Sequence, residues 1–329
     1  MKTTYEFAKE LIQQVNPTDS YKGENYDTWK KEAREKLSKL LGMDKFTKVA
    51  PETEIEYTEK IDGATEIRFT FQSEKGYRVP CHLLLPDGVE NPPVIICLQG
   101  HSTGMHISLG KPKFEGDEAT INGGDRDFCV RAIKEGFAAI AVEQRNFGEL
   151  GQTRCHEPSM TNLLIGRTTV GERVWDISRL IDIIETEFAD KVDASCISLM
   201  GNSGGGTATA YTAALEDRIV LAMPSCAMCT YKDSIGAMHH CACNYVPGIA
   251  KYFDMGDLGG LIAPRKMVVS NGKEDPIFPI EGAIESANII KQLYERAGAA
   301  ENFAFYIGDG GHQAYTGAVM ELLEEMLSE

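Results

Sequence analysis

The chain is poor in basic residues, with 33 lysines and arginines against 49 aspartates and glutamates and a formal net charge of −16. This balance argues against nucleic acid or an anionic membrane as a partner, and it disfavours strongly acidic polysaccharides as substrates. No stretch approaches the length of a membrane span, and residues 1–7 lack the apolar core of a signal peptide. Repeats and low-complexity segments are also missing. We therefore expect a cytoplasmic protein that could form a homo-oligomer, with neither nucleic acid nor a membrane as a partner.

The sequence has nine cysteines, an odd number, scattered over 329 residues. In a cytoplasmic protein such cysteines are expected to be reduced thiols, several of them core residues, rather than a disulfide framework. With 43% hydrophobic residues, the chain can bury one large core, or one core and a small extra domain.

The hydrophobic pattern predicts an α/β fold. Runs with β character and turn signals between them suggest antiparallel first strands at 54–61, 66–71 and 78–85. Continuous apolar runs, which are typical of parallel strands buried on both faces, follow at 94–98, 138–142, 197–200, 219–222, 267–269 and 303–307. Helical patterns lie at 28–41, 127–135, 172–188, 204–215, 280–297 and 315–327.

This pattern divides the chain into two parts. Residues 1–50 are expected to form a helical extension packed on the main domain, and residues 51–329 the main domain itself. Two connections, at about 100–125 and 226–264, are too long to be plain loops, and both leave the carboxyl end of a strand. Since ligands of such sheets bind at those ends, we expect both connections to border the site.

Residues 201–206 read Gly-Asn-Ser-Gly-Gly-Gly and follow an apolar strand, which is the pattern of a nucleophile elbow. A strand that turns sharply into a helix holds its apex residue in a strained conformation, and neighbouring side chains would clash there. Gly201 and Gly205 avoid that clash. Ser203 is therefore the predicted nucleophile, with the N–H of Gly204 facing a developing oxyanion.

A serine nucleophile needs a base, and the base needs an orienting acid. The strand at 267–269 runs into Asp275, our predicted acid, with Glu274 as the substitute. The last strand runs into Gly310-Gly311-His312, and His312 is the predicted base. Nucleophile, acid and base thus follow one another in the order that this fold type requires.

The second oxyanion donor is expected in the loop after the strand at 94–98, which reads Gln99-Gly100-His101. Gly100 permits close approach of the backbone, so the N–H of His101 is the candidate donor. Beyond the next strand, we interpret Arg145 as part of a buried ion pair with Glu143 that fixes the neighbouring loops.

Taken together, these motifs resemble the α/β-hydrolase superfamily over residues 50–329. Trp175-Asp176, the 201–206 motif, Pro224-Ser225-Cys226 and residues 262–265 are more narrowly similar to bacterial acetyl xylan esterase-like and cephalosporin-C deacetylase-like proteins. The resemblance implies a serine carboxylesterase that removes short acyl groups, often acetyl from sugars, without a metal or cofactor. Two departures bear on the substrate: Gln99 replaces a histidine common at the oxyanion loop, and Asn146-Phe147-Gly148 follows Arg145 where many of these esterases have Gly-Gln.

The connection at 226–264 contains six residues of types that can bind a metal, namely Cys226, Cys229, His239, His240, Cys241 and Cys243. Their spacing fits no strong zinc pattern, and adjacent ligands are geometrically awkward, so we expect no metal. We instead place part of this connection in the substrate pocket. The pocket candidates are Gln99, Tyr231, His239, His240 and Tyr245.

The sequence and the resemblance together predict a serine esterase that hydrolyses short acyl esters, with acetyl esters of carbohydrates preferred. The expected partner is a small-molecule or oligosaccharide ester substrate. A serine peptidase of the prolyl-oligopeptidase type, a general carboxylesterase or lactonase, and a non-catalytic binding protein on a hydrolase fold remain alternatives. The segment before residue 90 is too short for the propeller that such peptidases usually carry.

Overall fold

The computed structural model describes residues 1–151 and 155–328. Within them one mixed sheet has the strand order β1-β2-β3-β5-β4-β6-β7-β8-β9. The first three strands and β5 pair antiparallel, and the pairs from β5 through β4 to β9 are parallel. The strands are β1 (Glu54–Ile61), β2 (Ala64–Glu74), β3 (Tyr77–Pro86), β4 (Pro93–Leu98), β5 (Ala138–Val142), β6 (Asp193–Asn202), β7 (Ile219–Ser225), β8 (Lys266–Gly272) and β9 (Phe303–Gly308).

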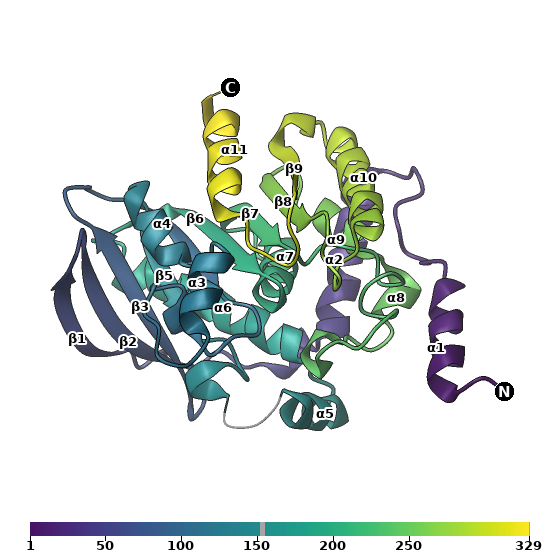
Figure 1. Cartoon of the computed structure of the whole chain (residues 1–329), viewed down its shortest axis with the longest axis horizontal. Coiled ribbons are helices and arrows are strands. Elements are labelled where there is room, and N and C mark those ends of the chain that lie inside the picture. Colours follow the sequence, from purple (N-terminus) through teal and green to yellow (C-terminus); the bar gives the residue numbers. More distant parts are fainter. Residues whose placement is uncertain (152–154, 329) are drawn as a thin grey trace.

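Helices cover both faces of this sheet (Figure 1). The longer ones are α1 (Thr4–Gln13), α2 (Tyr26–Leu41), α5 (His156–Leu164), α6 (Thr169–Glu187), α7 (Gly204–Leu215), α10 (Ile280–Arg296) and α11 (Thr316–Ser328). The shorter ones are α3 (Asp117–Gly123), α4 (Phe128–Lys134), α8 (Ile249–Tyr252) and α9 (Met255–Gly260).

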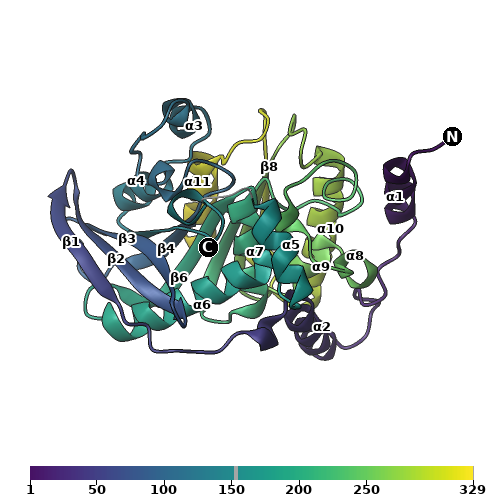
Figure 2. The same ribbon diagram turned by 90° about the horizontal axis from the view of Figure 1, so that it is seen from below.

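The core lies in two layers, one on each face of the sheet. Buried apolar side chains of α2, α6, α7, α9 and α10 pack on one face, and those of α4 and α11 pack on the other. Figure 2 shows α6 and α4 on opposite sides of the sheet. This arrangement buries the parallel strands on both faces, as their continuous apolar runs predict.

Helix α2 shows how the sequence fixes a local element. Asn25 caps its first turn by accepting a hydrogen bond from the N–H of Thr28 at 3.0 Å. Gly42 ends it in the left-handed region at φ 75°, a conformation that favours glycine. The buried face between these caps consists of Trp29, Ala33, Leu37 and Leu41, which join the larger core layer.

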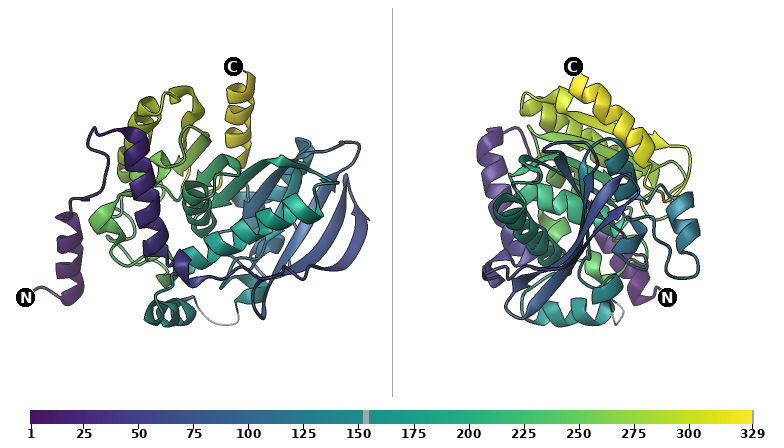
Figure 3. Two further views of the ribbon diagram at one scale, coloured as in Figure 1. Left: turned by 180° about the vertical axis from the view of Figure 1, so that it is seen from behind. Right: turned by 90° about the vertical axis from the view of Figure 1, so that its left-hand side faces the viewer.

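The predicted α/β fold class is confirmed, and every expected strand and helix is present. The sequence reasoning missed α1, α3, α5, α8 and α9. Helix α1 has no buried residue and stands apart from the sheet beside the 231–251 segment (Figure 3, left). Among the described residues, no helix combines the length and apolarity needed to cross a membrane.

Candidate active site

Ser203 lies between β6 and α7 in a strained conformation, with φ 56° and ψ −121°. Its backbone N–H donates to the carbonyl of Ser225 on the adjacent strand at 2.8 Å. The elbow has no room for larger residues, because a Cβ on Gly205 would lie 2.0 Å from the carbonyl oxygen of Leu98. The turn therefore needs glycine at this position, as the motif predicts.

His312 and Asp275 are in direct contact. The Nδ1 atom of His312 lies 2.8 Å from Oδ2 of Asp275, while Oδ1 of Asp275 accepts hydrogen bonds from the N–H groups of Ile277 (2.8 Å) and Phe278 (3.1 Å). Burial alone would raise the pKa of Asp275, but these hydrogen bonds and the charge of the histidine outweigh it and hold the pKa below its ordinary value. Glu274 is exposed and is not the partner of His312.

One residue ties the loop of His312 to the elbow. The Ser225 hydroxyl donates to the carbonyls of Gln313 (3.0 Å) and Ala314 (2.8 Å), while its own carbonyl accepts from the N–H of Ser203. Residues 1–151 and 155–328 offer the Ser203 hydroxyl no hydrogen-bond partner. Long or absent contacts between nucleophile and base are common in structures without substrate, so this does not argue against His312 as the base.

The loop after β4 packs directly on the elbow. A Cβ on Gly100 would lie 2.9 Å from Cβ of Ser203, so only glycine permits this approach. The His101 ring lies beside Gly204 and packs edge-on against Phe147, with 4.7 Å between ring centroids. His101 and Gly204 are thus neighbours at the head of α7, where the oxyanion donors are predicted.

Gln99, a pocket candidate, is buried beneath this loop. Its side-chain amide donates to the Ser108 hydroxyl and to the Arg126 carbonyl, both at 2.7 Å, and its own carbonyl accepts from the Gln144 side chain. Gln99 therefore holds the 100–125 connection in place, and it lines neither of the two cavities described in the next paragraphs.

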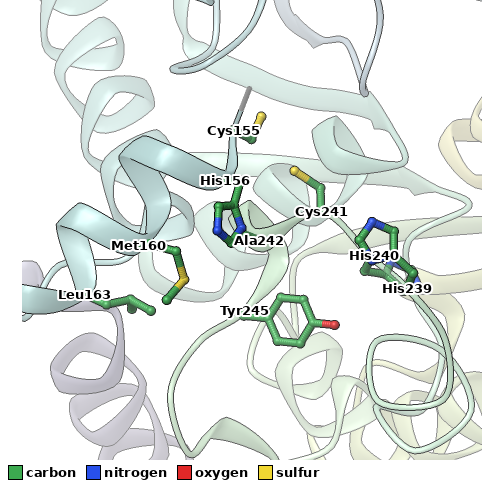
Figure 4. Close-up of a pocket in the computed structure, with 9 residues that line it drawn as sticks. All are labelled: Cys155, His156, Met160, Leu163, His239, His240, Cys241, Ala242 and Tyr245. Atoms are coloured by element: carbon green, nitrogen blue, oxygen red, sulfur yellow. The ribbon is translucent and has the colours of Figure 1, made fainter. Parts of the chain in front are cut away.

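A cavity of about 580 Å³ lies between α5 and the 226–264 connection (Figure 4). Three pocket candidates, His239, His240 and Tyr245, line it. Among the described residues, its lining is Cys155, His156, Met160, Leu163, His239, His240, Cys241, Ala242 and Tyr245.

An aromatic stack connects this cavity to the candidate base. The His240 ring meets the Phe278 ring edge-on at 5.5 Å, and Phe278 stacks on His312 at 5.9 Å. Burial lowers the pKa of His240 to about 4, so its ring is neutral at pH 7. Tyr231, by contrast, is buried against Tyr211 and lines a second cavity of about 390 Å³, next to α1.

Two arginines flank the site in different ways. Arg145 is buried and paired with Asp176 (2.7 Å), Glu74 (2.8 Å) and Glu172 (3.0 Å), so it forms the expected buried ion pair but not with Glu143. Arg126 is half-buried, and its guanidinium donates to the His312 carbonyl at 3.4 Å. In the described part of the chain no carboxylate lies within ion-pair distance of Arg126.

Sequence reasoning missed Arg126 and the α5 side chains of the cavity. Arg126 lies in an irregular turn, where no periodicity marks its orientation. Helix α5 has a readable apolar pattern (Met160, Leu163 and Leu164), but nothing in the sequence shows that it faces residues 239–245.

In the part of the chain that the structure describes, two groups of side chains bring potential metal ligands within 4.8 Å of one another. One consists of Cys226, Asp275 and His312 and belongs to the candidate acid and base. The other consists of His101, Cys155, Cys241 and Cys243. Neither corresponds to the set weighed from the sequence, because Cys229 instead donates to the Pro279 carbonyl and His239 is exposed.

Comparisons with known proteins agree with this architecture. Residues 2–161 match a family model described as "Abhydrolase family", and residues 94–230 match "Glucuronyl esterase, fungi". The Bacillus subtilis (strain 168) protein named "Putative hydrolase YtaP" is 26% identical over 242 residues, which is 71% of this chain and 78% of that protein.

Solved structures with the same fold include a protein of Bacteroides fragilis NCTC 9343, described as a putative acetyl xylan esterase. It has a TM-score of 0.77 at 16% identity, over 93% of this chain and 82% of the other. A glucuronoyl esterase from Solibacter usitatus has a TM-score of 0.70 at 17% identity, over 95% and 98% of the two chains. The fold and these matches confirm the predicted superfamily and the prediction of a hydrolytic enzyme.

Proposed function

Because the chain is an α/β-hydrolase, we propose that it is a serine carboxylesterase acting on short acyl esters of carbohydrates, with Ser203, His312 and Asp275 as its catalytic triad. The observation that carries the proposal is the His312–Asp275 hydrogen bond, on a loop that Ser225 ties to the strained elbow of Ser203. A structural turn would need neither the strain nor the oriented imidazole.

The proposed reaction is a two-step acyl transfer. His312 takes the Ser203 proton as the hydroxyl oxygen attacks the ester carbonyl, and the N–H groups of Gly204 and His101 stabilise the oxyanion. Asp275 holds the His312 ring with Nδ1 protonated, so that Nε2 is free to accept the proton. The alcohol leaves with that proton, and water then cleaves the acyl-enzyme and regenerates Ser203.

Carbohydrate esters are favoured as substrates by two observations. The neighbours in fold include proteins described as acetyl xylan and glucuronoyl esterases. The cavity of about 580 Å³ beside His240 is large enough for a sugar, and histidine and tyrosine side chains supply polar edges along its apolar wall. We propose the acetyl ester of a sugar as the preferred substrate.

Arg126 favours a second candidate, an ester of a sugar acid. Its guanidinium is half-buried beside His312 and has no carboxylate partner among the described residues, and burial lowers its pKa. Such a group can bind the oxygen atoms of a uronic acid ring. The match of residues 94–230 to the glucuronyl esterase model points the same way.

The test is a comparison of ester classes with Ser203→Ala as the control. Hydrolysis of p-nitrophenyl acetate, butyrate and octanoate measures the acyl preference, and acetylated xylooligosaccharides and benzyl glucuronate distinguish the two candidates. We expect acetate to be preferred and the control to be inactive. An Arg126→Gln variant should lose activity on benzyl glucuronate more than on p-nitrophenyl acetate if the second candidate holds.

Preference for longer acyl chains would indicate a general carboxylesterase, and cleavage of X-Pro amides would indicate a peptidase. If no ester or amide is hydrolysed in a Ser203-dependent way, the proposal fails and a binding role takes its place.

A further inference from the structure

Three cysteines and one histidine from separate parts of the chain meet beside the oxyanion loop. His101 follows β4, Cys155 precedes α5, and Cys241 and Cys243 belong to the 226–264 connection. Their ligand atoms, three Sγ and one ring nitrogen, all lie within 4.8 Å of one another, and His101 Nε2 is 3.2 Å from Cys243 Sγ. Figure 4 shows Cys155 and Cys241 side by side at the edge of the cavity.

These distances suit a tetrahedral metal. With Zn–S near 2.3 Å and Zn–N near 2.0 Å, the sulfur and nitrogen atoms of a regular tetrahedron are separated by about 3.5–3.8 Å. Three thiols and one imidazole are also the donor set that favours zinc over magnesium or calcium. None of the described cysteines forms a disulfide, so all three sulfur atoms are free to bind.

A second, independent observation concerns charge. Arg173 is 2% exposed, and its guanidinium donates to the Arg145 carbonyl and lies 4.1 Å above the Phe147 ring. In the described chain it has no carboxylate within ion-pair distance, although a buried cation normally needs an anion. Cys243 is the thiol against which this guanidinium lies.

We propose that His101, Cys155, Cys241 and Cys243 bind one zinc ion. Three thiolates and one Zn²⁺ give a net charge of −1, which is the counter-charge that Arg173 lacks. Neutral thiols or a disulfide would leave that arginine uncompensated. This metal site differs from our expectation of no metal, which considered only the cysteines and histidines of the 226–264 connection and neither His101 nor Cys155.

The site has four protein ligands and therefore no open position, which makes it structural rather than catalytic. It joins the oxyanion loop, the start of α5 and the 226–264 connection at one point. His101 binds through Nε2 while its Nδ1 side faces Gly204, where an added Cβ would lie 3.2 Å from Nδ1. Zinc thus fixes the backbone of His101 beside the elbow; this positioning role rests on the proposed function, whereas metal binding does not.

The direct test is the metal content of protein purified without chelators and under reducing conditions. We expect about one zinc per chain, and tetrahedral thiolate d–d absorption after exchange with Co²⁺. Cys243→Ser should lower the zinc content at least fivefold and abolish the cobalt bands. The matched control is Cys196→Ser, since Cys196 lies half-buried on β6 outside the cluster and should leave both signals unchanged.

If Cys243→Ser does not fold, Cys155→Ser replaces it, because Cys155 is less deeply buried, at 8% exposed against 1% for Cys243. Sub-stoichiometric zinc after incubation with excess Zn²⁺, unchanged zinc in the folded variants, or a disulfide among the three cysteines in non-reducing mass spectrometry would each overturn the proposal. Ser203→Ala should retain full zinc. If the purified protein contains zinc but hydrolyses no ester, the proposed function is refuted and the proposed metal site is not.

Discussion

The hydrogen bonds of Asp275 predict the effect of removing its charge without changing its shape. Oδ1 is held by two backbone N–H donors, from Ile277 at 2.8 Å and Phe278 at 3.1 Å. In Asp275→Asn the amide oxygen must stay on these donors, because a flipped amide would face them with its own N–H groups. The –NH₂ group then points at Nδ1 of His312 and can only donate.

This orientation forces the wrong tautomer of His312. Nδ1 becomes the acceptor, the proton moves to Nε2, and Nε2 can no longer take the Ser203 proton. We expect kcat to fall by about 10⁴ with little change in KM, since the substrate-binding groups are untouched. In free energy this corresponds to about 5.5 kcal/mol of transition-state stabilisation.

The assay is the hydrolysis of p-nitrophenyl acetate by purified variants whose circular dichroism matches that of the wild type. The matched control is Glu274→Gln, which removes the charge of the exposed neighbour and should keep nearly full activity. An Asp275→Asn variant within tenfold of the wild type would refute the tautomer argument. A large loss in Glu274→Gln instead would identify that residue as the acid.

Three further predictions concern stability. Arg145→Ala leaves buried carboxylates such as Asp176 without their cation and should reduce the free energy of unfolding by about 3–5 kcal/mol in urea titrations; a loss below about 1 kcal/mol would contradict the buried network. Gly205→Ala places a methyl group 2.0 Å from the Leu98 carbonyl and should lower the melting temperature and the activity together, as calorimetry and the ester assay would reveal. The pKa of His240 is about 4 in the folded protein and about 6.5 in the unfolded chain, so between pH 6.5 and 4 only the unfolded chain binds this proton. The free energy of unfolding should therefore fall by up to about 1.4 kcal/mol for each pH unit of acidification in this range. His240→Asn should remove this part of the pH dependence in urea titrations.

The sequence predicts the strands and the helices α2, α4, α6, α7, α10 and α11, because each of these has its own hydrophobic pattern, whereas it misses α1, α3, α5, α8 and α9. The nucleophile elbow is readable for the same reason, since Gly201, Ser203 and Gly205 are close in sequence and their roles follow from local sterics. Asp275 and His312 could be proposed because parallel strands bring their carboxyl ends to one edge of the sheet. The contact between them depends on two loops and had to come from the structure.

The walls of the cavity and the four-residue metal cluster could not be predicted in this way. Cys155 and Cys241 are 86 positions apart in the sequence, and no local sequence pattern indicates that α5 packs against residues 239–245. The same limit explains Gln99. Its place after β4 suggested the pocket, but its hydrogen bonds to Ser108 and Arg126 depend on how the following 27 residues fold back.

The backbone of Ser203 has an evolutionary consequence. A non-glycine residue at φ 56° and ψ −121° costs of the order of 1–3 kcal/mol, which glycine would largely avoid. A lineage freed from selection for hydrolysis could therefore become more stable by losing this serine. Mutational drift at position 203 would run towards glycine, and the serine persists only while its reactivity is selected.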